Sequence, residues 1–370
     1  MKKKVYFENL DGLRFLCFLS VFFYHSFYTE STYVQQHDVY RFFKFFLWKN
    51  GNLGVNFFFV LSGFLITWLL IDEKQTTGKI AIPAFWMRRI LRIWPLFYLC
   101  VFIGFYLFPF CKGLLGQVSR ETAEISSYLL FLNNFDIIRN GMPDSSLLGV
   151  LWSVAIEEQF YLFWPVILSF FPIRRMWIVF TAVIIASLIY RQLQTEHFAL
   201  QFHTLSCIGD MGVGALGAWM VICFPLFREK IEQASRFVIA GVYLLFLVFF
   251  LYLERIVSIP GFPVSAERLM LSLLILFIIL EQNYATRSFF KMSTFSLLSR
   301  LGQMTYGMYC LHFIGILITI QVFKQFGWQN QLWHVLVWET VLSLVLTIFI
   351  SWMSYRFFEK PFLQLKQRFE

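Results

Sequence analysis

Long apolar runs separated by short polar segments dominate the pattern of this chain. An apolar run of roughly 17–25 residues is long enough to cross a bilayer as a helix. The pattern therefore predicts an all-α integral membrane protein, with about ten transmembrane helices around a central cavity. The predicted spans are residues 10–29, 54–72, 93–110, 150–170, 176–192, 205–223, 237–253, 266–281, 303–323 and 334–357.

The segments between the predicted spans are mostly short. The two longest are 30–53 and 111–149, and within the second the apolar run 126–135 is too short to span, which suits a re-entrant or interfacial helix. No linker, low-complexity tract or internal repeat stands out. We therefore expect a single membrane domain over residues 1–370, with no appended soluble domain.

Composition agrees with a membrane protein and excludes a soluble one. The chain has 370 residues, of which 58% are hydrophobic and only 14% charged, whereas soluble domains carry about 25% charged residues. The net charge of +9 suggests a nucleic-acid partner, but the basic residues lie at the ends of apolar runs, where the positive-inside rule places them. We expect contact with membrane lipid and none with nucleic acid.

The basic residues also predict an orientation. Loops on the side that holds both termini carry about twice as many Lys and Arg as the loops on the other side, which predicts cytoplasmic N- and C-termini in a multi-pass protein of the inner or plasma membrane. The first apolar run is followed by no small-residue cleavage site, so we expect it to stay in the mature protein.

The six cysteines predict no special chemistry. They include no C-x-x-C pair, and most lie inside apolar segments, where cysteine serves as a small apolar side chain. We expect no disulfide, metal site or redox centre.

The first predicted span carries ionisable residues that are costly in hydrocarbon. Arg14 and His25 are about 16 Å apart along a helix and about 20° apart around it, so they share one face. A cation near the cytoplasmic surface and an imidazole in the outer half suit a long anionic ligand that enters from the cytoplasm. A snorkelling arginine with an unrelated buried histidine explains the pair equally well, and Asp11 could simply pair with Arg14.

The third span begins with three arginines, Arg88, Arg89 and Arg92. Arg89 and Arg92 are spaced i,i+3 and lie on one helix face. Guanidinium groups bind phosphate in a bidentate manner that lysine cannot copy, so this pair predicts a phosphate site. The positive-inside rule accounts for one or two of these residues but not for arginine over lysine.

The fourth span carries two carboxylates. Ser153, Glu157 and Tyr161 follow each other at i,i+4 on one stripe, and Glu158 is rotated about 100° from it. Glu157 would lie about 10 Å below the outer surface, close to the depth of His25. An interfacial glutamate on a slightly shifted span is the alternative.

Other spans hold fewer candidates. Ser62 interrupts an apolar run together with a glycine, which usually indicates close helix packing. Asp210 lies in the outer half of the sixth span among small residues. Tyr309 and His312 lie near the middle of the ninth span, which makes it a candidate cavity wall.

These ionisable residues bear on three classes of function. A transferase that draws an activated group from a cytoplasmic donor needs a phosphate site (Arg14, Arg89, Arg92) and an acid/base group in a cavity (His25). A proton-coupled transporter would also use buried His, Glu and Asp, but it more often shows inverted repeats or broken helix pairs. A haem protein with paired axial histidines is excluded, because no two histidines are suitably spaced on one predicted span.

Six segments, taken in order, resemble motifs of the acyltransferase type 3 family, membrane enzymes that O-acylate surface polysaccharides and related acceptors. They are LDGLR with the later His (Leu10 to His25), GVNFFFVLSGFLIT, RRILRIWPLFYL, LWSVAIEEQFYLFWP, TYGMYCLHF and YRFFEKPF. The resemblance covers nearly the whole chain. One departure is Asn56, which stands where the family commonly has an aspartate, so we assign it no acid role.

The resemblance implies a function and a set of roles. An acyl group would pass from acyl-CoA to a hydroxyl of a polysaccharide, glycolipid or similar acceptor. Acetyl is expected because it is the group that the family transfers most often. Acyl-CoA would be a donor substrate and not a tightly bound cofactor. The phosphorylated head of the donor would contact Arg89 and Arg92, and its arm would pass Arg14. His25 would be the general base or a transient acyl carrier, oriented by Glu157 or Asp210.

The same resemblance implies further contacts and one further partner. The fourth-span motif adds Trp152 to Ser153 as a cavity residue. Many relatives carry a C-terminal hydrolase-like domain, so a partner protein could be needed to complete the transfer. Neither the acceptor nor the oligomeric state can be derived from the sequence.

Overall fold

The computed structural model describes residues 6–369, which form helices and no strand. Seven helical stretches are long and apolar enough to cross a membrane, so the chain is a multi-pass membrane protein. They are α4 (Leu53–Thr77); Ile82–Leu114, which joins α5 (Ile82–Phe102), η2 (Ile103–Leu107) and α6 (Phe108–Leu114); Ile173–Leu193, which joins η3 (Ile173–Arg175) and α11 (Met176–Leu193); His197–Cys223, which contains α12 (His197–Phe202) and α13 (Thr204–Cys223); α15 (Arg236–Val257); α18 (Thr305–Gln325); and His334–Lys366, which joins η6 (His334–Glu339), α19 (Thr340–Met353), η7 (Ser354–Glu359) and α20 (Lys360–Lys366).

Three further long helices coincide with the remaining predicted spans. These are α1 (Glu8–His25), α10 (Trp152–Phe170) and α16 (Val264–Tyr284), of 18, 19 and 21 residues. All three carry charged residues within apolar sequence, which lowers their apolar character relative to the other seven. Every predicted span thus lies on a long helix, while the number of crossings stays a prediction.

Short helices fill the two long connecting segments. Between α1 and α4 they are α2 (Thr32–Gln36), α3 (Asp38–Phe42) and η1 (Phe43–Leu47). Between α6 and α10 the run 126–135 forms no single helix, because the chain turns at Phe131, whose φ is 55°. The turn separates α7 (Ile125–Leu129) from α8 (Asn133–Asn140), and α9 (Ser146–Gly149) follows. The other short helices are α14 (Pro225–Glu232), η4 (Met292–Thr294), α17 (Ser296–Gln303), η5 (Trp328–Asn330) and η8 (Gln367–Phe369).

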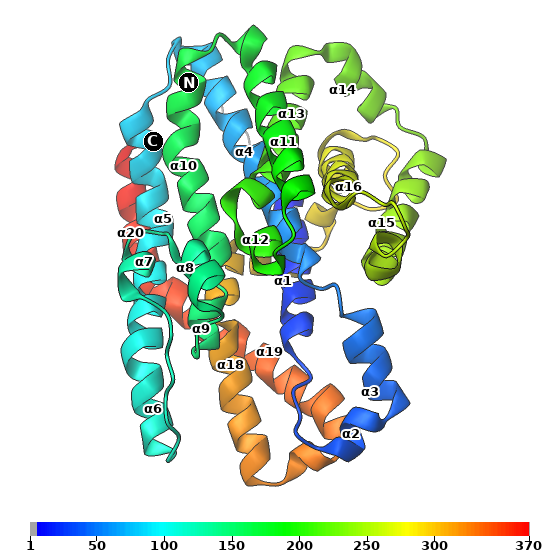
Figure 1. Cartoon of the computed structure of the whole chain (residues 1–370). Helices are drawn as coiled ribbons and strands as arrows, with labels where there is room; N and C mark the ends of the chain where they lie inside the picture. Colours follow the sequence, from blue (N-terminus) through cyan, green and yellow to red (C-terminus); the bar gives the residue numbers. More distant parts are fainter. Residues whose placement is uncertain (1–5, 370) are drawn as a thin grey trace.

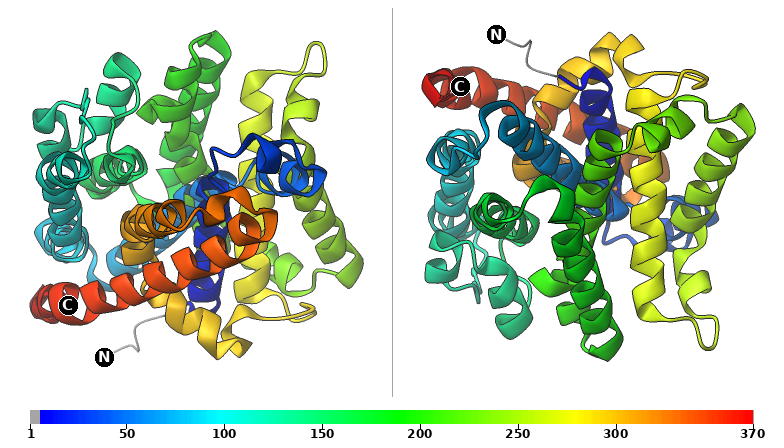
Figure 2. Two further views of the ribbon diagram at one scale, coloured as in Figure 1. Left: turned by 90° about the horizontal axis from the view of Figure 1, so that it is seen from below. Right: turned by 90° about the horizontal axis from the view of Figure 1, so that it is seen from above.

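Two groups of long helices run in different directions, and α19 slants across the molecule (Figure 1). Helices α5, α10 and α18 run from top to bottom in Figure 1, whereas α15 and α16 are seen nearly end-on there. Viewed from above or below, α16 and α15 lie lengthwise and α5 is seen end-on (Figure 2). Helix α1 lies between these two sets and contacts α4, α16, α17 and α18. The central position of α1 places its polar residues between several helices instead of against lipid.

Glycines allow α4 and α13 to pack closely against each other. A Cβ at Gly63 would overlap the backbone oxygen of Met211, and a Cβ at Gly214 would overlap that of Val60. The two backbones therefore meet at positions where only glycine fits, as expected from the small residues of both spans.

Candidate active site

One cavity of about 460 Å³ lies where α1, α4, α5, α10 and α18 meet. Its size suits an elongated small molecule or one arm of a larger one. At one end the lining includes the exposed Tyr6 and the partly exposed Arg14 and Lys366, so the cavity opens there. Its polar lining consists of Tyr6, Arg14, Ser62, Arg89, Arg92, Ser153, Glu157, Tyr161, Thr305, Tyr306, Tyr309 and Lys366.

The three arginines expected to hold a phosphorylated donor line this same cavity. Arg14 comes from α1, and Arg89 and Arg92 come from α5. Arg88 points elsewhere: its Nη1 donates to the backbone oxygen of Phe369 at 2.8 Å, and its Nη2 lies 3.8 Å from a carboxylate oxygen of Glu73. Arg89 and Arg92, spaced i,i+3, thus face the cavity, and Arg88 does not.

Arg14 and Arg89 differ in how their charge is balanced. Arg14 Nη1 forms an ion pair with Asp11 Oδ1 at 2.6 Å, and the Tyr6 hydroxyl donates to the other oxygen of Asp11. The sequence suggested this pairing of Asp11. Arg89 is held by ring faces, with its Cζ 5.4 Å from the ring centroid of Phe85 and 5.5 Å from that of Tyr161.

Arg89 also keeps an unused donor. Its Nε is buried and has no hydrogen-bond partner among residues 6–369. Buried polar groups are nearly always paired, so this donor on a residue that lines the cavity is available to an acceptor on a ligand.

The stripe on α10 faces the cavity as its spacing predicts. Glu157 Oε1 accepts a hydrogen bond from Ser62 Oγ at 2.6 Å, and Ser62 in turn accepts one from the Tyr161 hydroxyl at 3.2 Å. Ser153 and Tyr309 share a hydrogen bond of 2.7 Å. Glu158 lies on another side of α10, where Trp94 Nε1 donates to it at 2.7 Å. The cavity therefore carries a polar column next to Arg89, whose guanidinium lies over the ring of Tyr161.

His25 lies beside the cavity and not in its wall. Its Nδ1 is 3.0 Å from Nε2 of His312, and the two ring centroids are 5.1 Å apart. His312 is fully buried, so it does not form the cavity wall that the sequence suggested; its Nδ1 is 2.7 Å from the backbone oxygen of Tyr309. Because Tyr309 does line the cavity, the contacts lead from the cavity through Tyr309 and His312 to the partly exposed His25.

Lys44 of η1 holds the end of α1 next to His25. Its Nζ donates to the backbone oxygens of Tyr24 at 3.1 Å and Ser26 at 2.6 Å. Burial lowers the pKa of Lys44 to about 8. No sequence pattern distinguishes Lys44, because a lysine in a loop looks like any other basic residue near a membrane.

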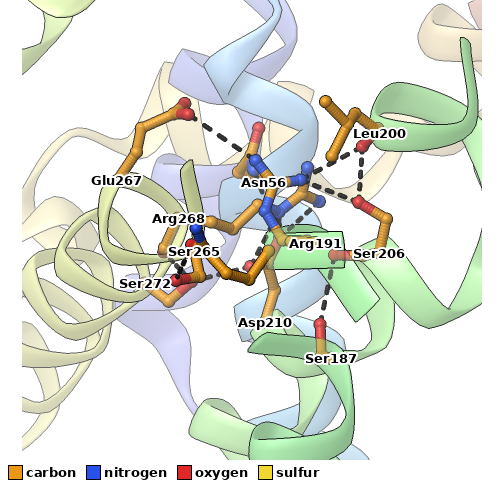
Figure 3. A network of polar contacts seen from close by, with 11 residues as sticks. Asn56, Ser187, Arg191, Leu200, Ser206, Asp210, Ser265, Glu267, Arg268 and Ser272 are labelled. Atoms are coloured by element: carbon orange, nitrogen blue, oxygen red, sulfur yellow. Dashed lines mark hydrogen bonds and ion pairs between the residues drawn. The ribbon is translucent and has the colours of Figure 1, made fainter. Parts of the chain in front are cut away.

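Asp210, a candidate partner of His25, is bound elsewhere (Figure 3). It is fully buried and forms an ion pair with Arg268 Nη2 at 2.7 Å. Ser272 Oγ donates to it at 2.7 Å, and Asn56 Nδ2 donates at 3.2 Å. Both of its oxygens are therefore used within the contact between α4, α13 and α16.

Two expected cavity roles differ from the observed positions. Neither Glu157 nor Asp210 is hydrogen-bonded to His25 among the described contacts, and the side chain that contacts Nδ1 of His25 is that of His312. Trp152 lies outside the cavity lining and packs edge-on against Phe59 and Phe202, with centroid distances of 6.0 and 5.0 Å. An indole in this position supports the start of α10 instead of contacting a ligand.

The described chain offers a further cation and no metal cluster. Lys366 of α20 lines the open end of the cavity together with Arg14 and Arg92. Its sequence gives no sign of this, because the terminal segment has the pattern of a basic tail. Within residues 6–369 no group of three or more His, Cys, Asp or Glu side chains could hold a metal ion, and all six cysteines are free.

Comparison with known proteins identifies the family. A family model described as an acyltransferase domain matches residues 7–356. The O-acetyltransferase OatA of Staphylococcus aureus strain NCTC 8325 is 28% identical over 378 residues, which cover 96% of this chain and 57% of OatA. A chain of S. aureus strain COL, SACOL0978, whose name assigns it provisionally to the O-acetyltransferases, is 28% identical over 379 residues, which cover 98% of this chain and 58% of the relative.

This chain thus spans less than three fifths of the length of these relatives. No solved structure matches it significantly. Because the family model covers residues 7–356, which is almost the whole chain, the chain belongs to the acyltransferase 3 family.

Proposed function

We propose that this protein is a membrane O-acyltransferase that moves an acyl group from acyl-CoA to a hydroxyl of a surface glycan, glycolipid or similar acceptor. The observation that carries the proposal is the convergence of Arg14, Arg89 and Arg92 from two helices on one cavity, which leads through Tyr309 to His25. The family membership and the names of the relatives support the same reaction.

The donor would be bound by charge at the open end of the cavity. Phosphate groups of CoA would lie against Arg89 and Arg92, and the buried Nε of Arg89 would gain an acceptor. Arg14 is already paired with Asp11, so its contact with the donor would be secondary to those of Arg89 and Arg92. The narrower pantetheine arm would follow the polar column of Ser62 and Ser153 toward Tyr309.

His25 would carry out the proton transfer. The acceptor oxygen attacks the thioester carbonyl carbon, the carbon–sulfur bond breaks, and the proton of the hydroxyl passes to the imidazole and then to the departing thiolate. Attack by the imidazole itself, with a transient acyl-histidine, would use the same position. The partly exposed side of His25 would receive the acceptor hydroxyl, and the thioester at the tip of the pantetheine arm would extend past Tyr309 to meet it there.

The expected topology gives this arrangement a direction. With α1, α10 and α16 added to the seven apolar stretches there would be ten crossings and both termini in the cytoplasm, in the inner or plasma membrane. Arg14 near the start of α1 would then face the compartment where CoA is available. His25 at the end of α1 would face the side of the acceptor.

Acetyl is the acyl group we propose, because both relatives are named for O-acetyl transfer. Those relatives are longer than this chain, so the final acceptor and a partner protein that completes the transfer belong to the proposal as well. A proton-coupled transporter is the alternative that the test below also addresses.

The first test replaces His25. We expect His25→Ala to abolish acetylation of the cell-surface glycan, measured by mass spectrometry of glycans from a deletion strain complemented with either gene. Equal membrane levels of the two proteins are the control. Full acetylation by the variant would contradict the role of His25, and unchanged glycans in the deletion strain with altered solute uptake would favour the transporter.

The second test concerns the arginines. Arg89→Lys with Arg92→Lys keeps the charge but removes bidentate geometry, so we expect about tenfold weaker binding of acetyl-CoA to the purified protein by calorimetry. Arg88→Lys is the matched control on the same helix, because Arg88 lies outside the cavity. Equal affinity of the wild type, the double variant and Arg88→Lys for acetyl-CoA would mean that the positive-inside rule alone explains these arginines.

A further inference from the structure

We infer that His312 is a positioning residue that holds His25 in the Nδ1–H tautomer, so that Nε2 of His25 carries the lone pair used in the reaction. The inference rests on the proposed function for the importance of His25, and on geometry for the tautomer. Nothing in the sequence motifs assigns His312 this role, since the expected partner of His25 was a carboxylate.

The direction of the two hydrogen bonds follows from one backbone oxygen. Nδ1 of His312 lies 2.7 Å from the carbonyl oxygen of Tyr309, and a carbonyl oxygen can only accept. Nδ1 of His312 must therefore carry a proton. In a neutral imidazole the other nitrogen is then an acceptor, so Nε2 of His312 accepts from Nδ1–H of His25 across 3.0 Å.

The consequence for His25 is a fixed basic atom. With its proton on Nδ1, neutral His25 has its lone pair on Nε2, which no described residue binds. This is the arrangement that a catalytic base needs, and a carboxylate enforces it in serine hydrolase triads. Here a neutral imidazole takes the place of the carboxylate.

The surroundings of His312 explain why a neutral partner fits. His312 is fully buried and its ring is surrounded by Phe18 and Phe313, with centroid distances of 6.2 and 4.6 Å. A carboxylate in this position would lose its hydration without a nearby cation to compensate, whereas imidazole accepts the same hydrogen bond without a charge. Lys44, the charged residue next to the end of α1, is engaged with backbone oxygens of that helix.

The pair also accounts for the proton balance of the proposed step. When Nε2 of His25 takes the proton of the acceptor hydroxyl, His25 becomes an imidazolium that still donates from Nδ1 to His312. The hydrogen bond becomes charge-assisted and therefore stronger as the charge forms. When the proton leaves for the thiolate, the pair returns to its starting state.

Nitrogen NMR of the protein labelled with ¹⁵N-histidine tests the tautomer without any activity measurement. The chain has six histidines, so the signals can be assigned by single replacements. We expect His25 to show a protonated Nδ1 and an unprotonated Nε2, and His312→Leu to shift His25 toward a mixture of tautomers. A wild-type His25 with a protonated Nε2, or one unaffected by His312→Leu, would overturn the inference.

Kinetics provide the second measurement. His312→Leu should lower kcat by about 10²-fold with little change in KM for acetyl-CoA, because the donor cavity is intact. His312→Gln keeps an acceptor oxygen for His25 and should recover a clear part of kcat, which a purely structural role would not predict. His197→Leu is the matched control, since His197 is exposed on α12.

The outcomes separate the two proposals. Loss of activity in His25→Ala with normal kcat in His312→Leu would refute the positioning role and leave the proposed function standing. Full activity in His25→Ala would refute the catalytic role of His25, and unchanged glycans in the deletion strain would refute the proposed function, while the NMR result would still decide the tautomer.

Discussion

At the scale of single residues, Lys44 shows how a side chain from a connecting segment can support a site on a membrane helix. Helix α1 ends at His25, and its last carbonyl groups have no partner within the helix. Lys44 donates to the backbone oxygens of Tyr24 and Ser26, on either side of His25. It thus fixes the turn that carries the proposed base.

The charge of Lys44 predicts a dependence of stability on pH. Burial lowers its pKa to about 8, below the ordinary value of about 10.4, so the folded protein binds fewer protons than the unfolded chain between these pH values. The contribution of Lys44 to stability should therefore rise as pH increases from about 8 to about 10.4.

The measurement compares wild type with Lys44→Met by thermal unfolding in detergent at about pH 7.5 and about pH 9.5. We expect the difference in melting temperature to move in favour of the wild type at the higher pH. A difference that stays constant, or moves the other way, would show that Lys44 keeps an ordinary pKa.

The residues of the site also show which contacts a sequence can predict. Asp11 and Arg14 are three positions apart on one helix, so helix geometry alone suggested their pairing. Ser62 and Glu157 are 95 positions apart, and His25 and His312 are 287 apart. Such pairs depend on how helices pack against one another, which the spacing within each helix does not determine.

At the scale of elements, the positions of the helices were predictable but some of their ends were not. Every predicted span lies on a long helix, because burial in lipid demands continuous apolar sequence. Helix α5 begins at Ile82, before the predicted residue 93, since Pro83 suits a first turn and arginine is a good helix former. Helix α1 ends at His25 instead of residue 29, because Ser26 is extended and Phe27 has a φ of 64°.

The contact between α4 and α13 supports a prediction about packing. Gly63→Ala would place a methyl group against the backbone oxygen of Met211, so the two helices would have to separate. We expect a loss of about 1–3 kcal/mol in stability, measured as a lower melting temperature in detergent. Gly241→Ala on α15 is the matched control, because a Cβ there meets no atom within 4 Å.

Gly63 lies next to Ser62, which lines the cavity, so the same substitution should also affect function. A displaced α4 would move Ser62 away from Glu157 and weaken acetyl-CoA binding at temperatures where the variant is still folded. Unchanged stability in Gly63→Ala would mean that the contact adapts at no cost and that small residues here are not required.

At the scale of the whole molecule, two sets of helices cross, and buried charges connect them. Arg268 of α16 pairs with Asp210 of α13 at 2.7 Å. Arg191 of α11 donates to Ser206 Oγ at 2.7 Å and lies 3.6 Å from a carboxylate oxygen of Glu267 (Figure 3). This cluster does not line the large cavity, so the charged groups between these packed helices are separate from the charged groups around the cavity.

This separation predicts that Asp210 acts on stability and not on the reaction. Asp210→Asn leaves Arg268 with a buried charge and no carboxylate opposite, which costs about 3–5 kcal/mol when a buried pair is broken on one side. The double variant Asp210→Leu, Arg268→Met removes both charges and should regain most of that loss. Melting temperatures of the two variants in detergent give the comparison.

Activity then decides between the two roles of Asp210. For the folded fraction of Asp210→Asn we expect kcat within about twofold of the wild type, because His25 already has His312 as its partner. His25→Ala, measured in parallel, sets the scale for losing a group that takes part in the chemistry. If Asp210→Asn lost activity to the same degree while its melting temperature stayed unchanged, Asp210 would belong to the proton path, and the charge cluster would be part of the active site.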